Sequence, residues 1–160
     1  MQESTTGAAA PELVTCEQTA TAVVRGTVTM DGITEFFDRS FGALPPAIAA
    51  QGAAITGPAF GRYDGEPADT IDIEVGFTVD REIRPDGDVV PGSLPAGRAA
   101  RLLHSGAFDG LDASWERLRA WIEGHGLTPA TMRWECYVTE PTPDMDPRDL
   151  RVELTWPVSD

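Results

Sequence analysis

Hydrophobic positions recur with a helical spacing in two parts of the chain. In residues 33–51 and 110–125 apolar side chains return every three or four positions, which is typical of a helix with one buried face. The second stripe consists of Leu111, Trp115, Leu118 and Ile122. Asp109 is suited to cap the second helix. We expect Pro45 and Pro46 to break or kink the first helix, because proline lacks an N–H and clashes with the preceding turn.

The segments around both helices alternate between apolar and polar residues, as half-buried strands do. The order strand, helix, strand, strand therefore occurs twice, and the two copies correspond in sequence. The aligned residues are Tyr63 with Tyr137, Gly61 with Glu135, Glu74 with Glu153, Phe77 with Trp156, Val79 with Val158, and Glu66-Pro67 with Glu140-Pro141. We infer a duplicated βαββ module.

This duplication predicts an α+β fold with one mostly antiparallel sheet, two helices on one face and a ligand pocket between the halves. We expect a disordered lead-in over residues 1–12 and a single domain over residues 13–160. The first module covers about 13–80 and the second about 93–160. A segment rich in turn residues, 80–93, links them.

Composition and charge exclude several classes of function. The 160 residues carry a net charge of −14, from 26 acidic and 12 basic side chains. Such a chain repels phosphate backbones, so we expect no nucleic-acid binding. No run is apolar enough to span a membrane and no signal peptide is evident, so we expect a cytoplasmic protein without membrane contact. Cys16 and Cys136 fit no metal-ligand spacing and no nucleotide motif is present, so we expect no metal and no cofactor.

The strand "MRWECYV", residues 132–138, places Glu135 among apolar residues. Alternation puts Arg133, Glu135 and Tyr137 on one face and Met132, Trp134, Cys136 and Val138 on the other. We expect the apolar set to pack beneath the helices and the mixed set to line the pocket. Alternatively, Glu135 forms a surface ion pair with Arg133 or another arginine.

Other candidate residues have simpler interpretations. Glu74 and Glu153 are expected on a solvated strand face, and His104 in a structural turn. Three tryptophans are expected in the core: Trp115, Trp121 and Trp134.

Five segments, taken in order, resemble the GyrI-like small-molecule-binding family, the effector-binding domain of multidrug-responsive regulators. They are "GPAFGRYD", "LPAGRAARLLHSGAFDGL", "WIEGHG", "WECYVTEP" and "VELTWPV", between about residues 20 and 158. The resemblance implies a pocket between two βαββ modules that binds bulky aromatic, often cationic compounds. It also implies that a glutamate on the strand after the second helix, here Glu135, meets the cation. With no helix-turn-helix segment, the chain resembles a stand-alone member.

We therefore expect a protein that binds lipophilic, preferentially cationic aromatic molecules and sequesters or senses them. The expected ligand-binding residues are Glu135, Tyr137, Tyr63, Gly61, Trp156 and Phe77, of which the last two also suit the core. An alternative is a hydrolase of strained, cyclopropane-containing toxins, which would use Glu135 with Glu153 as a candidate second acid. A second alternative is a gyrase-modulating protein.

Overall fold

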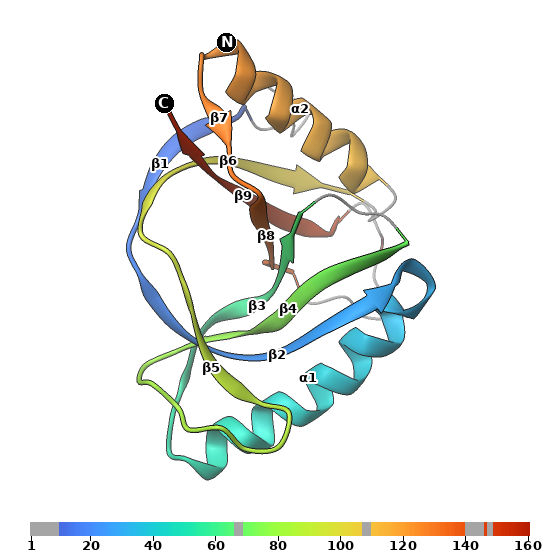
Figure 1. Ribbon diagram of the computed structural model, residues 1–160, viewed down its shortest axis with the longest axis vertical. Coiled ribbons are helices and arrows are strands. Elements are labelled where there is room, and N and C mark those ends of the chain that lie inside the picture. Colours follow the sequence, from blue (N-terminus) through green and yellow to red (C-terminus); the bar gives the residue numbers. More distant parts are fainter. Residues whose placement is uncertain (1–9, 66–68, 107–109, 140–145, 147–148) are drawn as a thin grey trace. The chain divides into compact units, whose positions relative to one another are not determined.

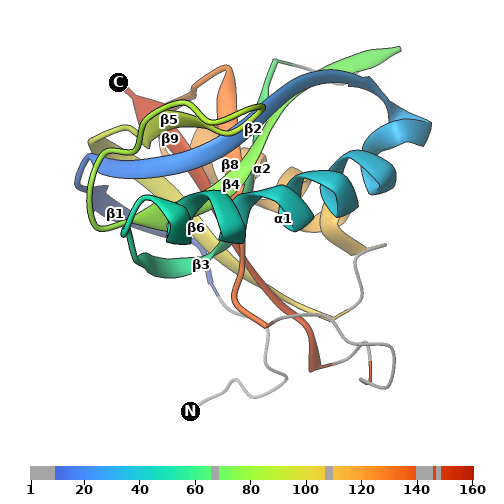
Figure 2. The same cartoon turned by 90° about the horizontal axis from the view of Figure 1, so that it is seen from below.

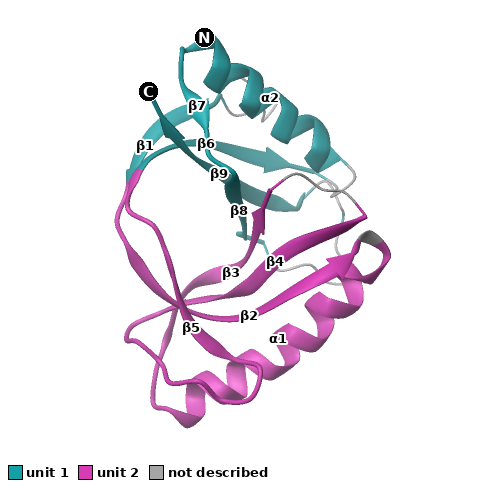
Figure 3. Cartoon of the chain, viewed as in Figure 1, with its two compact units in different colours: residues 1–15, 98–160 teal, residues 16–97 magenta. Residues whose placement is uncertain are grey.

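The computed structural model describes residues 10–65, 69–106, 110–139, 146 and 149–160, and the chain forms two compact units. Unit 2 comprises residues 16–97, and unit 1 combines residues 1–15 with 98–160 (Figure 3). Residues 1–9 of the expected lead-in, the expected cap Asp109 and the two aligned Glu-Pro pairs lie outside the described residues.

Unit 2 is a four-stranded antiparallel sheet with one helix on it. Its elements are β2 (Thr19–Thr29), the short 3-10 helix η1 (Met30–Gly32), α1 (Ile33–Ala50), β3 (Ile55–Asp64), β4 (Thr70–Val79) and β5 (Val90–Leu94). The strand order is β3-β4-β2-β5. Helix α1 runs along β2 and β4 in both views (Figures 1 and 2). Its stripe of Phe36, Leu44 and Ile48 packs on apolar residues of these strands.

Unit 1 repeats this plan. Its elements are β1 (Glu12–Cys16), β6 (Gly97–Ser105), α2 (Leu111–Gly124), β7 (Thr128–Pro129), β8 (Met132–Tyr137) and β9 (Arg151–Ser159). The strand order is β1-β6-β9-β8, and β7 also pairs with β9. The predicted stripe of α2 is confirmed, since Trp115, Leu118 and Ile122 pack on residues of β6 and β9.

The strand registers confirm the duplication. Residues aligned from the sequence occupy corresponding positions in the two ladders. The matched pairs are Ile55–Val79 with Pro129–Val158, Gly61–Val75 with Glu135–Leu154, and Tyr63–Ile73 with Tyr137–Val152. Both helices are followed by a glycine with positive φ, Gly52 at 71° and Gly126 at 75°. Counting back from these glycines, Phe41 of α1 corresponds to Trp115 of α2.

The structure shows no break of the first helix at the two prolines, and it shows a strand in the segment expected to be a linker. Helix α1 continues from Ile33 to Ala50 through Pro45 and Pro46. Leu44 and Ala47 flank the two prolines and are buried. Their packing stabilises the helix at the point where Pro45 and Pro46 donate no backbone hydrogen bond. In addition, the expected linker contains β5, which pairs with β2. No helix among the described residues combines the length and apolar character that a membrane span requires.

Candidate functional site

Glu135 is a buried carboxylate with two aromatic hydrogen-bond donors. Only 6% of the residue is exposed. The indole Nε1 of Trp115 donates to its Oε2 over 2.9 Å, and the Tyr137 hydroxyl donates to its Oε1 over 3.0 Å. A buried carboxylate needs such donors, because it has lost its hydration. Both of its oxygens are therefore held in place by ring systems.

The face of β8 that carries Glu135 is the face covered by α2, which corrects the expectation from the sequence. Trp115, a donor to Glu135, belongs to α2, and Tyr137 packs against the same core as that helix. The two sets of β8 residues were separated correctly, but the mixed set lies beneath the helix. The physical reason is that the indole N–H and the phenol supply the polar partners that the carboxylate requires.

Trp115, one of the two donors, belongs to a group of two indole rings and a guanidinium. The rings of Trp115 and Trp156 meet edge to face, with centroids 5.4 Å apart and an interplanar angle of 85°. The guanidinium carbon of Arg133 lies 4.8 Å from the Trp115 centroid and 4.9 Å from the Trp156 centroid. These are cation–π distances. The Trp156 indole also donates to the carbonyl oxygen of Ala130 over 2.8 Å, which fixes its orientation.

Unit 2 shows what this part of the fold looks like without the polar groups. At the corresponding positions Phe41 and Phe77 also meet edge to face, with centroids 5.6 Å apart and an interplanar angle of 72°. Ala59 and Gly61 stand where unit 1 has Arg133 and Glu135. Both units therefore place an aromatic pair here, while the indole N–H, the arginine and the glutamate are specific to unit 1.

The predicted site residues thus fall into two groups. Glu135, Tyr137 and Trp156 belong to unit 1 and meet in the arrangement described above, which we call the Trp–Glu site together with Trp115 and Arg133. Tyr63, Gly61 and Phe77 belong to unit 2 and occupy the equivalent positions there. The expected binding of a ligand by all six residues, in a pocket between the halves, stays a prediction.

Of the two further glutamates, Glu153 lies on the strand face expected from the sequence, whereas Glu74 is more buried than expected. Glu153 pairs with Arg101 over 3.5 Å, on the face of β9 away from α2. It does not approach Glu135, which lies on the helix side. Glu74 was expected to be solvated, but it is only 7% exposed, and its Oε2 accepts from Arg25 Nε over 2.9 Å. The arginine partner makes this burial possible.

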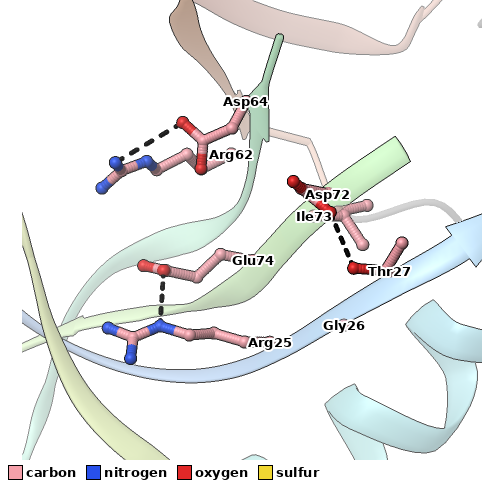
Figure 4. Close-up of a pocket in the computed structure, with 8 residues that line it drawn as sticks. All are labelled: Arg25, Gly26, Thr27, Arg62, Asp64, Asp72, Ile73 and Glu74. Carbon is pink, nitrogen blue, oxygen red and sulfur yellow. Dashed lines mark hydrogen bonds and ion pairs between the residues drawn. The ribbon is translucent and has the colours of Figure 1, made fainter. Parts of the chain in front are cut away.

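Glu74 belongs to a hollow of about 570 Å³ on the face of unit 2 away from α1 (Figure 4). Both of its arginines are paired with carboxylates: besides the Arg25–Glu74 contact, Arg62 lies 3.6 Å from Asp64. Asp72 accepts a hydrogen bond from the Thr27 hydroxyl over 2.7 Å. None of the eight lining residues is aromatic. This hollow therefore suits a small polar molecule better than a bulky aromatic one.

Metal chemistry receives no support from the part of the chain that the structure describes, since no group of three or more potential ligands gathers there. His104 lies in β6 rather than in the expected turn. It is buried, and its Nδ1 lies 2.7 Å from the Ser114 hydroxyl of α2, which agrees with a structural role.

Sequence reasoning missed two residues of the Trp–Glu site. Trp115 was assigned to the core, which is correct, but a buried indole N–H also needs an acceptor. Glu135, a carboxylate within an apolar strand, needs a donor in turn, and these two needs could have linked the residues. Arg133 was considered only as an ion-pair partner, although a cation close to tryptophans also suits a ring face.

Comparisons with known proteins agree with this architecture. The model of the GyrI-like small molecule binding domain matches residues 9–159. The crystal structure of the EcmrR C-terminal domain is similar, with a TM-score of 0.80 and 19% identity, over 94% of this chain and 98% of that one. In the EcmrR–DNA complex the TM-score is 0.80 and the identity 21%, over 94% of this chain and 57% of that longer chain.

Two further structures show the same fold. A hydrolase from Listeria innocua has a TM-score of 0.65 and 15% identity, over 93% of this chain and 91% of that one. SAV2435 bound to tetraphenylphosphonium has a TM-score of 0.66 and 13% identity, over 94% of both chains. Comparison with curated protein sequences gives no match. The family model covers nearly all of the sequence, and the chain belongs to the GyrI-like family of small-molecule-binding domains.

Proposed function

We propose that this protein binds bulky, aromatic, lipophilic cations, with Glu135 as the counter-ion and the indoles of Trp115 and Trp156 as ring surfaces. The observation that carries the proposal is the difference between the two units. The same fold is built in unit 2 with phenylalanines, Ala59 and Gly61, whereas unit 1 adds a buried carboxylate and indole rings at these positions.

The cost of burying a charge favours a ligand of this class. A carboxylate beneath a helix has lost most of its hydration, so a cation that is itself weakly hydrated gains strongly by lying close to it. Indole faces add cation–π attraction and apolar area. Contacts of this kind recognise charge and aromatic surface more than detailed shape, which permits a range of related ligands.

The neighbours in structure support this class of ligand. SAV2435 was solved with tetraphenylphosphonium, a lipophilic aromatic cation. Its identity of 13% to this chain shows a common fold, and the transfer of the ligand class is our proposal. We propose sequestering or sensing of the ligand as the role.

The test compares two ions of nearly equal shape and opposite charge, tetraphenylphosphonium and tetraphenylborate, by calorimetric titration. Glu135→Gln keeps the size of the side chain and removes its charge. Because a charge-assisted contact in a partly dry site contributes roughly 1.5–3 kcal/mol, the phosphonium should lose about tenfold to a hundredfold in affinity. The affinity for tetraphenylborate should stay the same or rise in this variant.

Glu153→Gln is the matched control, since it removes the same charge from the neighbouring strand on the opposite face. It should change the affinity for the phosphonium less than threefold. Equal losses in both variants would mean that only the overall negative charge attracts the cation. Equal losses for both ions in Glu135→Gln would mean that this residue acts through folding.

Hydrolysis of a strained electrophile is the second candidate, because the Tyr137 hydroxyl lies 3.0 Å from Oε1 of Glu135. A phenol and a carboxylate in contact can pass a proton, so Glu135 would act as the base for water and Tyr137 as its partner. One structural neighbour is described as a hydrolase. Mass spectrometry of a cyclopropane-containing alkylating agent incubated with the protein decides: turnover that disappears in Glu135→Gln while binding persists would establish the hydrolase.

A further inference from the structure

The Trp–Glu site already contains a cation that belongs to the chain itself. The guanidinium carbon of Arg133 lies 4.8 Å and 4.9 Å from the centroids of Trp115 and Trp156, so one positive group contacts both indoles. Arg133 lies two positions before Glu135 on β8 and therefore on the same face. A positive charge, two ring surfaces and a buried carboxylate are thus assembled without any ligand.

The fold does not require this arginine. In unit 2 the corresponding position is Ala59, and the aromatic pair Phe41–Phe77 keeps almost the same edge-to-face geometry. Arg133 is half-buried as a residue, with its Nε in the buried part, while both indoles are at least 94% buried. A long side chain of this kind can move its charged end into water without disturbing the core beneath it.

We propose that Arg133 is a built-in competitor for the ligand: its guanidinium occupies the cation position over the two indoles and must leave before a lipophilic cation binds. This inference rests on the proposed function. Displacing Arg133 costs its cation–π contacts, and an incoming ion must offset that cost. A large ion with phenyl groups does so by burying apolar surface, whereas a small, well-hydrated alkylammonium ion does not. Arg133 therefore selects aromatic lipophilic cations against small ones.

The experiment measures the affinity of tetraphenylphosphonium and tetramethylammonium for the wild type and for Arg133→Met, whose side chain keeps apolar bulk without the charge. Removing the competitor should raise the phosphonium affinity about fivefold to thirtyfold, the equivalent of two cation–π contacts. It should also bring tetramethylammonium into the measurable range, so that the ratio of the two affinities falls.

Arg119→Met is the matched control. The Arg119 guanidinium carbon lies 5.1 Å from the Trp156 ring, so this variant removes the same charge close to the site. Arg119 is on α2, and its replacement leaves Arg133 in place over the two indoles. Its replacement should change the phosphonium affinity less than twofold. An equal rise in both variants would show a general charge effect and would overturn the competitor role.

A second measurement needs no variant. Protons of Arg133 beneath two indoles have ring-current-shifted NMR signals, and saturating phosphonium should move them towards the positions of free arginine. Signals that keep their shift while the ligand is bound would overturn the inference. If phosphonium binding depends on Glu135 but does not rise in Arg133→Met, the inference fails and the proposed function stands. If the phosphonium binds neither the wild type nor Arg133→Met, both fail.

Discussion

Trp115 has two roles: its ring packs in the core, and its indole nitrogen donates a hydrogen bond to Glu135. Its ring makes the same edge-to-face contact with Trp156 that Phe41 makes with Phe77 in the other unit, so the packing role needs only an aromatic ring. What phenylalanine cannot supply is the indole N–H that donates to Glu135. The tryptophan therefore serves the core with its ring and the carboxylate with its nitrogen.

Trp115→Phe should separate these two roles. The ring contact remains, and the carboxylate loses one of its donors, so the free energy of unfolding should fall by about 1.5–3 kcal/mol, the usual contribution of a hydrogen bond to a charged group. Urea unfolding followed by circular dichroism measures the change. Trp121 lies on the same helix but does not donate to the carboxylate, so Trp121→Phe should lower the free energy of unfolding by less than about 1 kcal/mol. Equal losses would mean that indole volume alone matters.

The sequence predicted Glu135 as the central acid but not the face that it occupies. Alternation along β8 determines which residues share a face, because successive side chains point in opposite directions. It does not determine which face a helix covers. That depended on Trp115, a residue 20 positions away that supplies the missing donor. Long-range pairs of this kind leave little trace in local periodicity.

At the scale of elements, both units pair one large and one small residue where strand and helix meet, but in unit 2 the small residue is on the strand and in unit 1 it is at the helix start. In unit 2, Gly26 of β2 lies beneath the Phe36 ring, and a Cβ on Gly26 would come within 2.7 Å of that ring. In unit 1 the corresponding residues are His104 on the strand and Gly110 at the helix start, with 3.2 Å between a Cβ on Gly110 and the imidazole. Each contact fills the same space from the opposite side.

Gly26→Ala should therefore destabilise the protein by about 1–3 kcal/mol, because the added methyl group overpacks a ring that is itself buried. The double variant Gly26→Ala with Phe36→Leu should lose less stability than the two single variants lose in sum. Thermal or urea unfolding of the four proteins in this cycle measures the coupling. Gly42→Ala, in an open position of α1, should instead stabilise by about 0.5–1 kcal/mol. Additive effects of the Gly26 and Phe36 substitutions would contradict the close packing of these two residues.

Both helices and six strands could be predicted, because their side chains form the core; the strands are β2, β3, β4, β6, β8 and β9. Strands β1 and β5 could not. Each lies at the edge of its unit and has five residues, and β5 contains Pro91 and Gly92. Edge strands of this kind depend on backbone pairing with a neighbour, which side-chain patterns do not record.

At the scale of the whole molecule, net charge decides which large partners are possible. The longer EcmrR chain was solved in complex with DNA, and this chain spans 57% of its length. With a net charge of −14, this chain should give no discrete complex with duplex DNA at physiological salt. A gel-shift assay at micromolar protein checks this, with a basic DNA-binding protein as the positive control. A discrete complex that weakens steeply with salt would contradict the prediction.

The path of the chain has a consequence for biosynthesis. Unit 2 is one continuous segment of the chain. Unit 1 is completed by β9, which lies between β6 and β8 in the sheet but comes last of the strands along the chain. On the ribosome, unit 2 is complete long before β9 emerges, and Trp156 arrives with that strand. A nascent chain that stalls before β9 leaves β6 and β8 as open strand edges that can pair with other chains. We therefore expect chaperones and proteases to act on the incomplete unit 1 of such a stalled chain rather than on unit 2.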